Sequence, residues 1–295
     1  MDNLNYQCEN NTNKLSCVTN KISASSHTDD IDGQPYQNYP YDKIGNLVAD
    51  KQESITNINW SVYGKISGII KRNTTTGKET TTQYGYDPSG NRTYKEVIRR
   101  DIGNSSQDIT DRTYYVRDAQ GNTWLLIAGT RSREIPPSLK WAEQHVYGSN
   151  RLGVMNLNLD IPAQAMVPPD NQTLADSLHT GQYAYKLSNH LGNVMATISD
   201  KKLFSNIVIP DNRPPDFYYP EVLSQTDYYA FGQETKERAY RISGGYRYGF
   251  NGKENDGEIK GEENQKITGF QKSSYTEKRK AFMNKYLGIT KEAIV

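Results

Sequence analysis

The chain has 295 residues, of which 35 are basic and 34 acidic, and its formal net charge is +1. This balance excludes a global attraction to nucleic acid or to an anionic membrane surface. The hydrophobic fraction is only 35%, and Tyr outnumbers Phe by 22 to 6. Because a Tyr ring suits a half-wet surface better than a dry core, we expect a thin, Tyr-lined structure with no nucleic-acid partner.

The N-terminal stretch "YQCENNTNKLSCVTN" (6–20) predicts a strand, a turn and a second strand. It contains both cysteines, Cys8 and Cys17, and the sequence leaves open whether they form a disulfide or stay as free thiols. No apolar segment follows a basic one at the start, so no signal peptide is predicted. No apolar run approaches the length of a membrane span.

The stretch "YGYDPSGNRTYKEV" (84–97) contains a complete turn signal. Its Asp, Pro and Gly take the first, second and fourth positions of a type I turn, and the Gly permits the positive φ of a three-residue hairpin loop. We expect the Asp to bond its own backbone in an Asx-turn rather than to bind calcium, since each turn holds one carboxylate. The residues of this template are Tyr86, Asp87, Pro88, Gly90 and Asn91.

The template recurs at spacings of about one hairpin. Tyr41, Tyr63 and Tyr86 are 22 and 23 residues apart, and in all-β folds a strand and its turn take about 8–12 residues. Weaker copies are expected at "VYGKISG", around Tyr63, and at "SNRLGV", with Asn150 and Gly153. The stronger copies are Tyr41, Asp42, Gly45 and Asn46; Asp118, Gly121 and Asn122; and Asn189, His190, Gly192 and Asn193.

Runs rich in Thr, Tyr and aliphatic residues separate these turns, at 57–70, 80–86, 112–116 and 122–129. Such residues favour a pleated, half-buried surface, and one hairpin cannot bury its apolar face alone. We therefore predict an all-β fold in which antiparallel hairpins stack into a curved, shell-like sheet. The alternative is a meander sandwich whose turns resemble one another by chance.

Three blocks in the second half resemble the repeat-associated core of the YD-repeat, or Rhs, family, in the style of its Bacteroidetes members. They are "NHLGNVMATISD" (189–200), "DYYAFG" (227–232) and "GGYRYGFNGKEND" (244–256). The resemblance covers roughly residues 1–265. It implies YD-repeat hairpins over 1–140, a core-like region over 141–265 and a divergent tail over 266–295.

What the resemblance implies is a β-sheet that spirals into a hollow shell. In polymorphic toxins of the family, such a shell encloses a variable C-terminal toxic domain, and the repeats carry no catalysis. This chain would be an open fragment of a shell, and its partners would be the remainder of that shell or its C-terminal cargo. The implied location is secreted or at the cell surface, as part of a larger exported protein.

The resemblance ends after "GEENQ" (261–265). The family continues there with a Tyr-Asp-Pro run and, in some members, an aspartate that supports self-cleavage. These residues have no counterpart here, so self-proteolysis is not expected and the core looks partial or truncated.

The tail predicts a helix over about 275–287. Ser274 and Glu277 have capping-box spacing, and Gly288 suits the position after a helix. We interpret it as a terminal helix that docks on the sheet or is partly ordered, with a remnant or the start of a variable toxin tip as the alternative. Two Pro-rich segments, 160–182 and 209–222, predict long loops at the sheet rim because Pro removes ladder donors.

No residue pattern points to catalysis, a cofactor or a metal. A triad of Ser188, His190 and Asp200 lacks a nucleophile elbow and is not expected, and the sequence has no phosphate loop or dinucleotide fingerprint. The histidines have no metal-like spacing; they are His27, His145, His179 and His190.

We therefore expect a non-enzymatic structural segment that encloses or presents a C-terminal polypeptide. One alternative is an exported Tyr-rich adhesion module that binds cell-surface glycan, and another is a toxin remnant that has lost its active tip. Exposed strand edges template association, so we expect the isolated chain to be poorly soluble.

Overall fold

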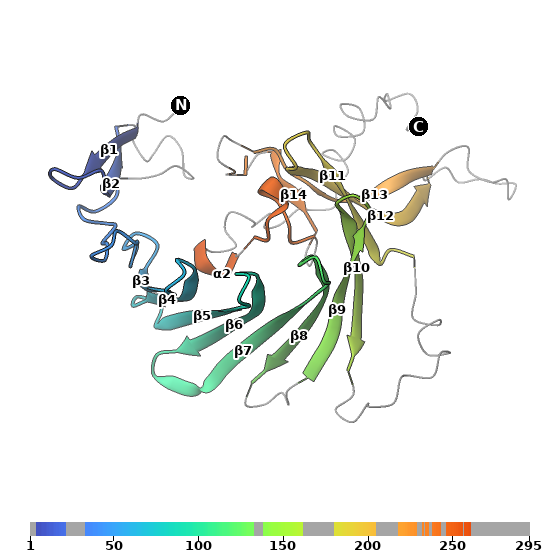
Figure 1. Cartoon of the computed structure of the whole chain (residues 1–295), viewed down its shortest axis with the longest axis horizontal. Coiled ribbons are helices and arrows are strands. Elements are labelled where there is room, and N and C mark those ends of the chain that lie inside the picture. The colour runs from blue at the N-terminus through green and yellow to red at the C-terminus, as the bar shows by residue number, and fades with distance from the viewer. Residues whose placement is uncertain are drawn as a thin grey trace, which may run out of the picture. The chain divides into compact units, whose positions relative to one another are not determined.

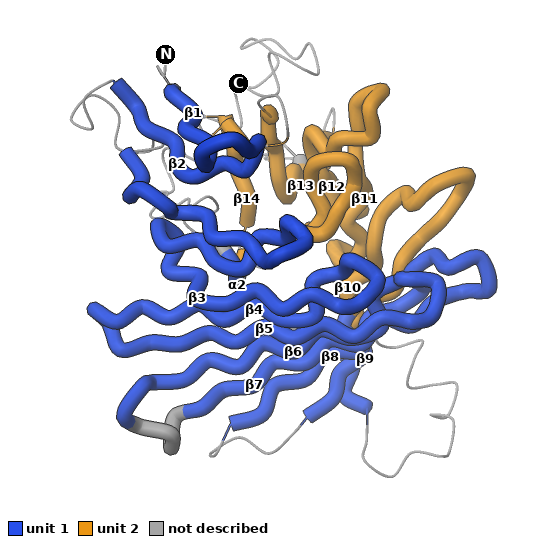
Figure 2. The backbone as a smooth tube through the Cα atoms, turned by 60° about the vertical axis from the view of Figure 1, so that its left-hand side comes forward, with its two compact units in different colours: residues 1–142, 159–162, 258–260 blue, residues 143–158, 163–257, 261–295 orange. Residues whose placement is uncertain are grey.

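The computed structural model describes residues 4–21, 33–132, 138–161, 180–204, 218–228, 232, 234–235, 238–242, 246–255 and 257–260. The chain divides into two compact units (Figure 2). Unit 1 comprises residues 1–142, 159–162 and 258–260, and unit 2 comprises 143–158, 163–257 and 261–295.

The predicted all-β class is confirmed for the described residues. Twelve strands form one sheet whose spatial order, from β14 to β3, is the reverse of the chain order without a crossover, and β1 and β2 form a separate hairpin. Figure 1 shows β3–β8 of unit 1 side by side in that order. The remaining described elements are the short helix α2 (Gly257–Lys260) and the 3-10 turn η3 (Phe250–Gly252). The strands are β1 (Leu4–Cys8), β2 (Leu15–Asn20), β3 (Ile55–Trp60), β4 (Ile66–Asn73), β5 (Lys78–Tyr86), β6 (Arg92–Asp101), β7 (Asn104–Arg117), β8 (Thr123–Arg131), β9 (Ser138–Tyr147), β10 (Arg151–Asp160), β11 (Tyr183–Ser188), β12 (Val194–Phe204), β13 (Tyr218–Gln225) and β14 (Tyr240–Arg241).

One face of β3–β5 carries the core of unit 1. Side chains alternate between the two faces of a strand, and in β5 Thr82 and Tyr84 are buried whereas Gln83 between them is exposed. The core cluster is completed from the late segment α2, whose Ile259 packs against it. Lys71 of β4 donates from Nζ to the backbone oxygen of Ile259 at 3.1 Å. The buried members of the cluster are Ile55, Ile58, Ile69 and Tyr84.

The core of unit 2 lies around β10, β11 and β12. Gly153 of β10 lies opposite Tyr185 of β11, and a Cβ added at Gly153 would lie 2.3 Å from the backbone oxygen of Ala184. Only glycine therefore fits where these two strands approach. The buried cluster beside them comprises Val154, Ala184, Val194, Leu223, Tyr246 and Tyr248.

The N-terminal hairpin has the predicted strand, turn and strand, and its cysteines are free thiols. Cys17 lies opposite Gln7, whereas Cys8 lies opposite Leu15. Because neighbouring residues of a strand point to opposite faces, Cys8 is exposed on one side while Cys17 is buried on the other. This register excludes the disulfide that the sequence left open.

Backbone hydrogen bonds connect this hairpin to the main sheet through residues 34–50. Tyr39 donates to the oxygen of Ser16 at 3.2 Å, and Ile58 of β3 donates to the oxygen of Val48 at 2.8 Å. The segment therefore covers the outer side of β3. At the other side of the hairpin, β1 pairs only with β2 among the described residues.

The prediction of a loop over 209–222 is wrong for its last part, because β13 begins at Tyr218. Pro220 lies opposite Lys202 of β12, next to a register shift between Ile198 and Lys202. Pro is tolerated where a ladder is interrupted in this way. Residues 209–217 lie outside the described residues.

Two further sequence predictions are corrected at β10. The loop expected over 160–182 begins one residue late, since Asp160 ends the strand, and 162–179 lie outside the described residues. The weak turn copy at Asn150 is also wrong, because its Gly153 lies inside β10. The helix predicted over 275–287 falls outside the described residues.

Candidate functional site

One turn geometry recurs seven times among the described residues. In each copy a residue pairs with the residue six positions later, and the glycine four positions after the first has a positive φ, between 64° and 95°. The pairs are Tyr41 with Leu47, Trp60 with Ile66, Tyr86 with Arg92, Arg117 with Thr123, Ser188 with Val194, Tyr228 with Glu234, and Tyr248 with Glu254. The glycines are Gly45, Gly64, Gly90, Gly121, Gly192, Gly232 and Gly252.

The first turn residue fixes this geometry through its side chain. Asp87 accepts from the backbone N–H of Asn91 at 2.8 Å and from its side-chain amide at 3.1 Å. Asp42 and Asp118 make the same two bonds to Asn46 and Asn122. In the fourth strong copy Asn189 accepts from the N–H groups of Leu191 and Asn193, both at 3.0 Å. Pro88 and His190, at the second turn position, are exposed.

Hydrogen bonds lower the pKa of the three turn aspartates below the usual 3.8. For Asp87 the largest cause is the backbone N–H of Asn91, and for Asp118 it is the side-chain amide of Asn122. For Asp42 partial burial acts to raise the pKa, but the bonds from Asn46 and its neighbours outweigh it. These carboxylates are thus held in the charged form by the turn itself.

We predict that the turn aspartates limit stability in acid. A group whose pKa is depressed by folding stabilises the fold above its unfolded pKa, and this contribution is lost as the pH falls through the folded value. Stability should therefore decline below about pH 4. The variant D42N/D87N/D118N should show a flatter decline, because Asn already occupies this position in the turn at Asn189. Urea midpoints measured at several pH values test this, with Asp160→Asn as a control at an exposed strand end; an unchanged pH profile in the triple variant would contradict it.

The turn predicted around Tyr63 lies at other positions than the sequence indicates. Ser61 takes the Asp position, where its Oγ accepts from the N–H of Lys65 at 3.2 Å, and Trp60 takes the Tyr position. Tyr63 lies at the tip of the turn, 87% exposed. Sequence analysis also missed the turn geometry at 228–234 and 248–254, which an aromatic residue four positions before Gly would have indicated.

Neighbouring turns of unit 1 lie side by side along one end of its strands. The Cε of Lys65 lies 3.4 Å from where a Cβ of Gly90 would stand. Arg117 joins the next pair, because its Nη2 donates to the oxygen of Arg92 at 2.9 Å and its Nη1 to that of Gly121 at 2.8 Å. In unit 2, Asn251 donates to Oδ1 of Asn193 at 2.9 Å. The turns thus form a row in each unit.

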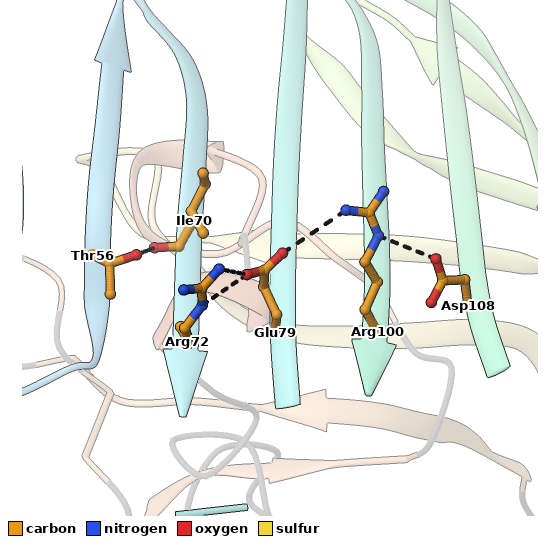
Figure 3. Close-up of polar contacts among 6 residues, drawn as sticks. All are labelled: Thr56, Ile70, Arg72, Glu79, Arg100 and Asp108. Carbon is orange, nitrogen blue, oxygen red and sulfur yellow. Dashed lines mark hydrogen bonds and ion pairs between the residues drawn. The ribbon is translucent and has the colours of Figure 1, made fainter. Parts of the chain in front are cut away.

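A row of ion pairs crosses β4–β7 on the face opposite the unit 1 core (Figure 3). Arg72 of β4 binds Glu79 of β5, and Arg100 of β6 lies between two carboxylates. Its Nη1 is 3.9 Å from Glu79 Oε1, and its Nε is 3.2 Å from Asp108 Oδ2. Each such exposed pair adds little stability in water, but together they balance the charge of this face.

Unit 2 contains a buried polar cluster. Glu143 and His145 of β9 are 8% and 4% exposed, and His145 Nε2 lies 3.2 Å from the hydroxyl of Tyr248. Arg247 Nε is 2.8 Å from Glu143 Oε1, and the guanidinium of Arg151 lies 3.5 Å above the Tyr248 ring. The cluster therefore fastens the hairpin 246–254 to β9 and β10.

Burial and charge act together on these groups. Burial raises the pKa of Tyr248, and the Glu143 carboxylate raises it further, so this hydroxyl is neutral and suited to hydrogen bonding. Burial acts to raise the pKa of Glu143 as well, but His145 and Arg247 outweigh it and the pKa is lowered. Removing the arginine partner of a charged, buried carboxylate is costly, so Glu143 and Arg247 form a structural ion pair.

Ser188, His190 and Asp200 do not come together as a triad in the described structure. Asp200 Oδ1 accepts from the N–H of Gly181 at 2.7 Å; it lies in the second half of β12, whereas His190 lies in the turn before that strand. Ser188 pairs with Val194 beside that turn. Within the described ranges there is also no group of three His, Cys, Asp or Glu residues placed to hold a metal ion.

Comparison with known proteins returned no match to any family model and none to any curated protein. Within the part of the chain that the structure describes, no helix is long and apolar enough to cross a membrane.

Proposed function

We propose that this chain is a non-enzymatic wall segment of an Rhs-type, YD-repeat β-shell, which encloses or presents a polypeptide that follows the repeats. The observation that carries the proposal is the uniform turn, which returns the chain antiparallel with the same register at seven places. A sheet whose strands are connected by the same turn each time can be extended hairpin by hairpin, as the wall of a shell requires. The same proposal places the chain outside the cell, as part of a larger exported protein.

The position of α2 supports a role in holding polypeptide. Ile259 lies 188 residues beyond Lys71 in sequence, yet it packs on the core face of β3–β5 and accepts a hydrogen bond from that lysine. Unit 1 therefore already binds a segment from near the end of the proposed core on the face that carries its apolar side chains. A cargo polypeptide continuing from this point would start on that face.

The coding DNA on both sides of this sequence tests the proposal. A shell segment should be preceded by further Tyr-Asp turns and followed by an unrelated domain, in frame or after a frameshift. Flanking DNA that encodes neither would contradict it.

We predict that the isolated chain self-associates through β1. The residues of β1 from Asn5 to Cys8 are exposed, and an unpaired strand edge templates pairing with another chain. Tyr6→Lys should reduce the fraction of oligomer in gel filtration with light scattering, because a charge on an edge strand opposes pairing. Tyr63→Lys is the control, since it places the same charge on an exposed turn. A wild-type chain that elutes as a clean monomer would overturn the prediction.

A further inference from the structure

Two neighbouring turns of unit 1 carry the three large apolar side chains that are most exposed among the described residues. Val62 is 94% exposed, Tyr63 87% and Ile44 85%. Each comes directly before the glycine of its turn or one position earlier, so all three stand at the turn tips. Isolated apolar residues are common on protein surfaces, but a cluster of them marks an interaction site.

These two turns lie side by side at the same end of the strands. Ile58 of β3 donates from its backbone N–H to the oxygen of Val48 at 2.8 Å, and Trp60 donates from Nε1 to the oxygen of Leu47 at 2.7 Å. Because Leu47 ends the first turn and Trp60 begins the second, the two tips are neighbours. We name their apolar side chains the tip patch, which comprises Ile44, Val62 and Tyr63.

Side-chain hydrogen bonds hold both tips in place before any partner binds. Asp42 Oδ1 accepts from the N–H groups of Ile44 at 3.0 Å and of Asn46 at 2.8 Å. In the second turn, Ser61 Oγ accepts from the N–H of Lys65 at 3.2 Å. A surface that is ordered in advance loses little conformational entropy when it binds.

The two turns present positive charge to the outside. Their charged residues are Asp42, Lys43 and Lys65. The Asp42 carboxylate is directed at the turn itself, because it also accepts from the side-chain amide of Asn46 at 2.9 Å. Both lysines are exposed. Although the chain as a whole is nearly neutral, its tip patch therefore lies beside two outward cations.

An anionic lipid bilayer has the complementary arrangement of chemical groups. Its acyl region accepts aliphatic side chains, its headgroup level accepts an amphipathic Tyr ring, and its anionic headgroups attract lysines, whose long stems let the charge stay outside the apolar region. Turn tips are also convex and narrow, whereas a stable protein interface needs a broad complementary surface. Shape and charge together favour a bilayer over another protein.

We propose that the tip patch, with Lys43 and Lys65, docks this protein on an anionic lipid bilayer. Ile44 and Val62 enter the boundary between headgroups and acyl chains, and the Tyr63 hydroxyl stays at the level of the headgroups. The two lysines contact the anionic lipids. This docking does not rest on the shell function, because it requires only two turns that unit 1 contains.

Flotation of the full chain with vesicles tests the proposal, and aggregated protein does not float. We expect the chain to bind phosphatidylcholine vesicles that contain about 30% phosphatidylserine, and to bind pure phosphatidylcholine about fivefold more weakly. Val62→Ser/Tyr63→Ser should weaken binding to the anionic vesicles about tenfold or more, because it removes two of the three inserted side chains. Lys43→Gln/Lys65→Gln should weaken it about five- to thirtyfold and leave binding to the neutral vesicles unchanged.

Leu191→Ser is the matched control. Leu191 is 64% exposed and also comes directly before the glycine of a turn, but this turn belongs to unit 2 and contains no lysine. The variant should bind vesicles as the wild type does. Circular dichroism establishes that each variant is folded. If Val62→Ser/Tyr63→Ser does not fold, Ile44→Ser replaces it and should weaken binding about threefold or more.

Three results would overturn the proposal: the wild type does not float with anionic vesicles, Val62→Ser/Tyr63→Ser binds them as the wild type does, or Leu191→Ser loses as much binding as that double variant. If no vesicle is bound and the double variant instead lowers the fraction of oligomer in gel filtration, the tip patch is an interface between copies of this chain and the proposal fails.

Discussion

Gly153→Ala should destabilise unit 2 by about 3 kcal/mol, near the upper end of the cost of overpacking a core. The added Cβ would lie 2.3 Å from the backbone oxygen of Ala184 and 3.0 Å from Cα of Tyr185. Both atoms belong to the backbone of β11, so no side-chain rotation relieves the contact and the strands must separate. Thermal unfolding followed by circular dichroism should show a melting temperature lower by about 5–10 °C.

Gly148→Ala is the control for this experiment. It adds the same methyl group five residues earlier, where the nearest atom is the side chain of Leu152 at 3.5 Å, an ordinary contact. Its melting temperature should stay close to that of the wild type. If both variants melt at the wild-type temperature, the close approach of β10 and β11 is not present.

Arg247→Met should cost about 3 kcal/mol, because it leaves the buried carboxylate of Glu143 without its arginine. The two atoms Arg247 Nε and Glu143 Oε1 are 2.8 Å apart, and the Glu143 side chain is only 10% exposed. Because methionine keeps most of the apolar part of the arginine side chain, the loss of stability measures the removal of the positive charge. The free energy of unfolding in urea measures it.

Two further variants separate the ion pair from general effects of losing an arginine. Arg238→Met removes the partner of Asp227 in a pair whose arginine is 62% exposed, and such pairs contribute about 0–1 kcal/mol. Glu143→Gln/Arg247→Met should recover the part of the stability that Glu143 accounts for, whereas the Glu254 carboxylate, 3.2 Å from Arg247 Nη1 and 12% exposed, still lacks its arginine. A double variant as unstable as the single one would show that the cost does not arise from the Glu143 charge.

The sequence predicts the local elements of this protein well, because they depend on residues that are close in the chain. The Asp and Gly of 87–90 specify a turn through a side-chain bond and a positive φ, and both are present. The sequence does not predict the turn at 61–65 in its correct position, because Ser61 replaces the aspartate that marks the other turns. The sequence around Pro220 predicts a loop. The register shift that lets a strand contain this proline lies in the partner strand β12, so residues 209–222 alone do not indicate it.

The contacts that sequence reasoning could not find join distant residues. Glu143 and Arg247 form an ion pair although about a hundred residues separate them in the sequence. The residues beside each of them in the sequence do not indicate this contact. Lys71 and Ile259 meet only because the end of the described chain returns to β4. The Tyr94 and Tyr114 pair needed the register of β6 and β7, which fixes which of many tyrosines share a face.

The strand order has a consequence for how the protein is made. Each strand of the main sheet from β3 to β13 pairs only with strands next to it in the chain. Synthesis on the ribosome can therefore add the strands one by one, each onto a partner that has already emerged. Contacts between distant residues, such as the one between Lys71 and Ile259, form only after the later residue has been synthesised. A gene could also gain or lose strands in pairs without changing the direction in which the next turn runs.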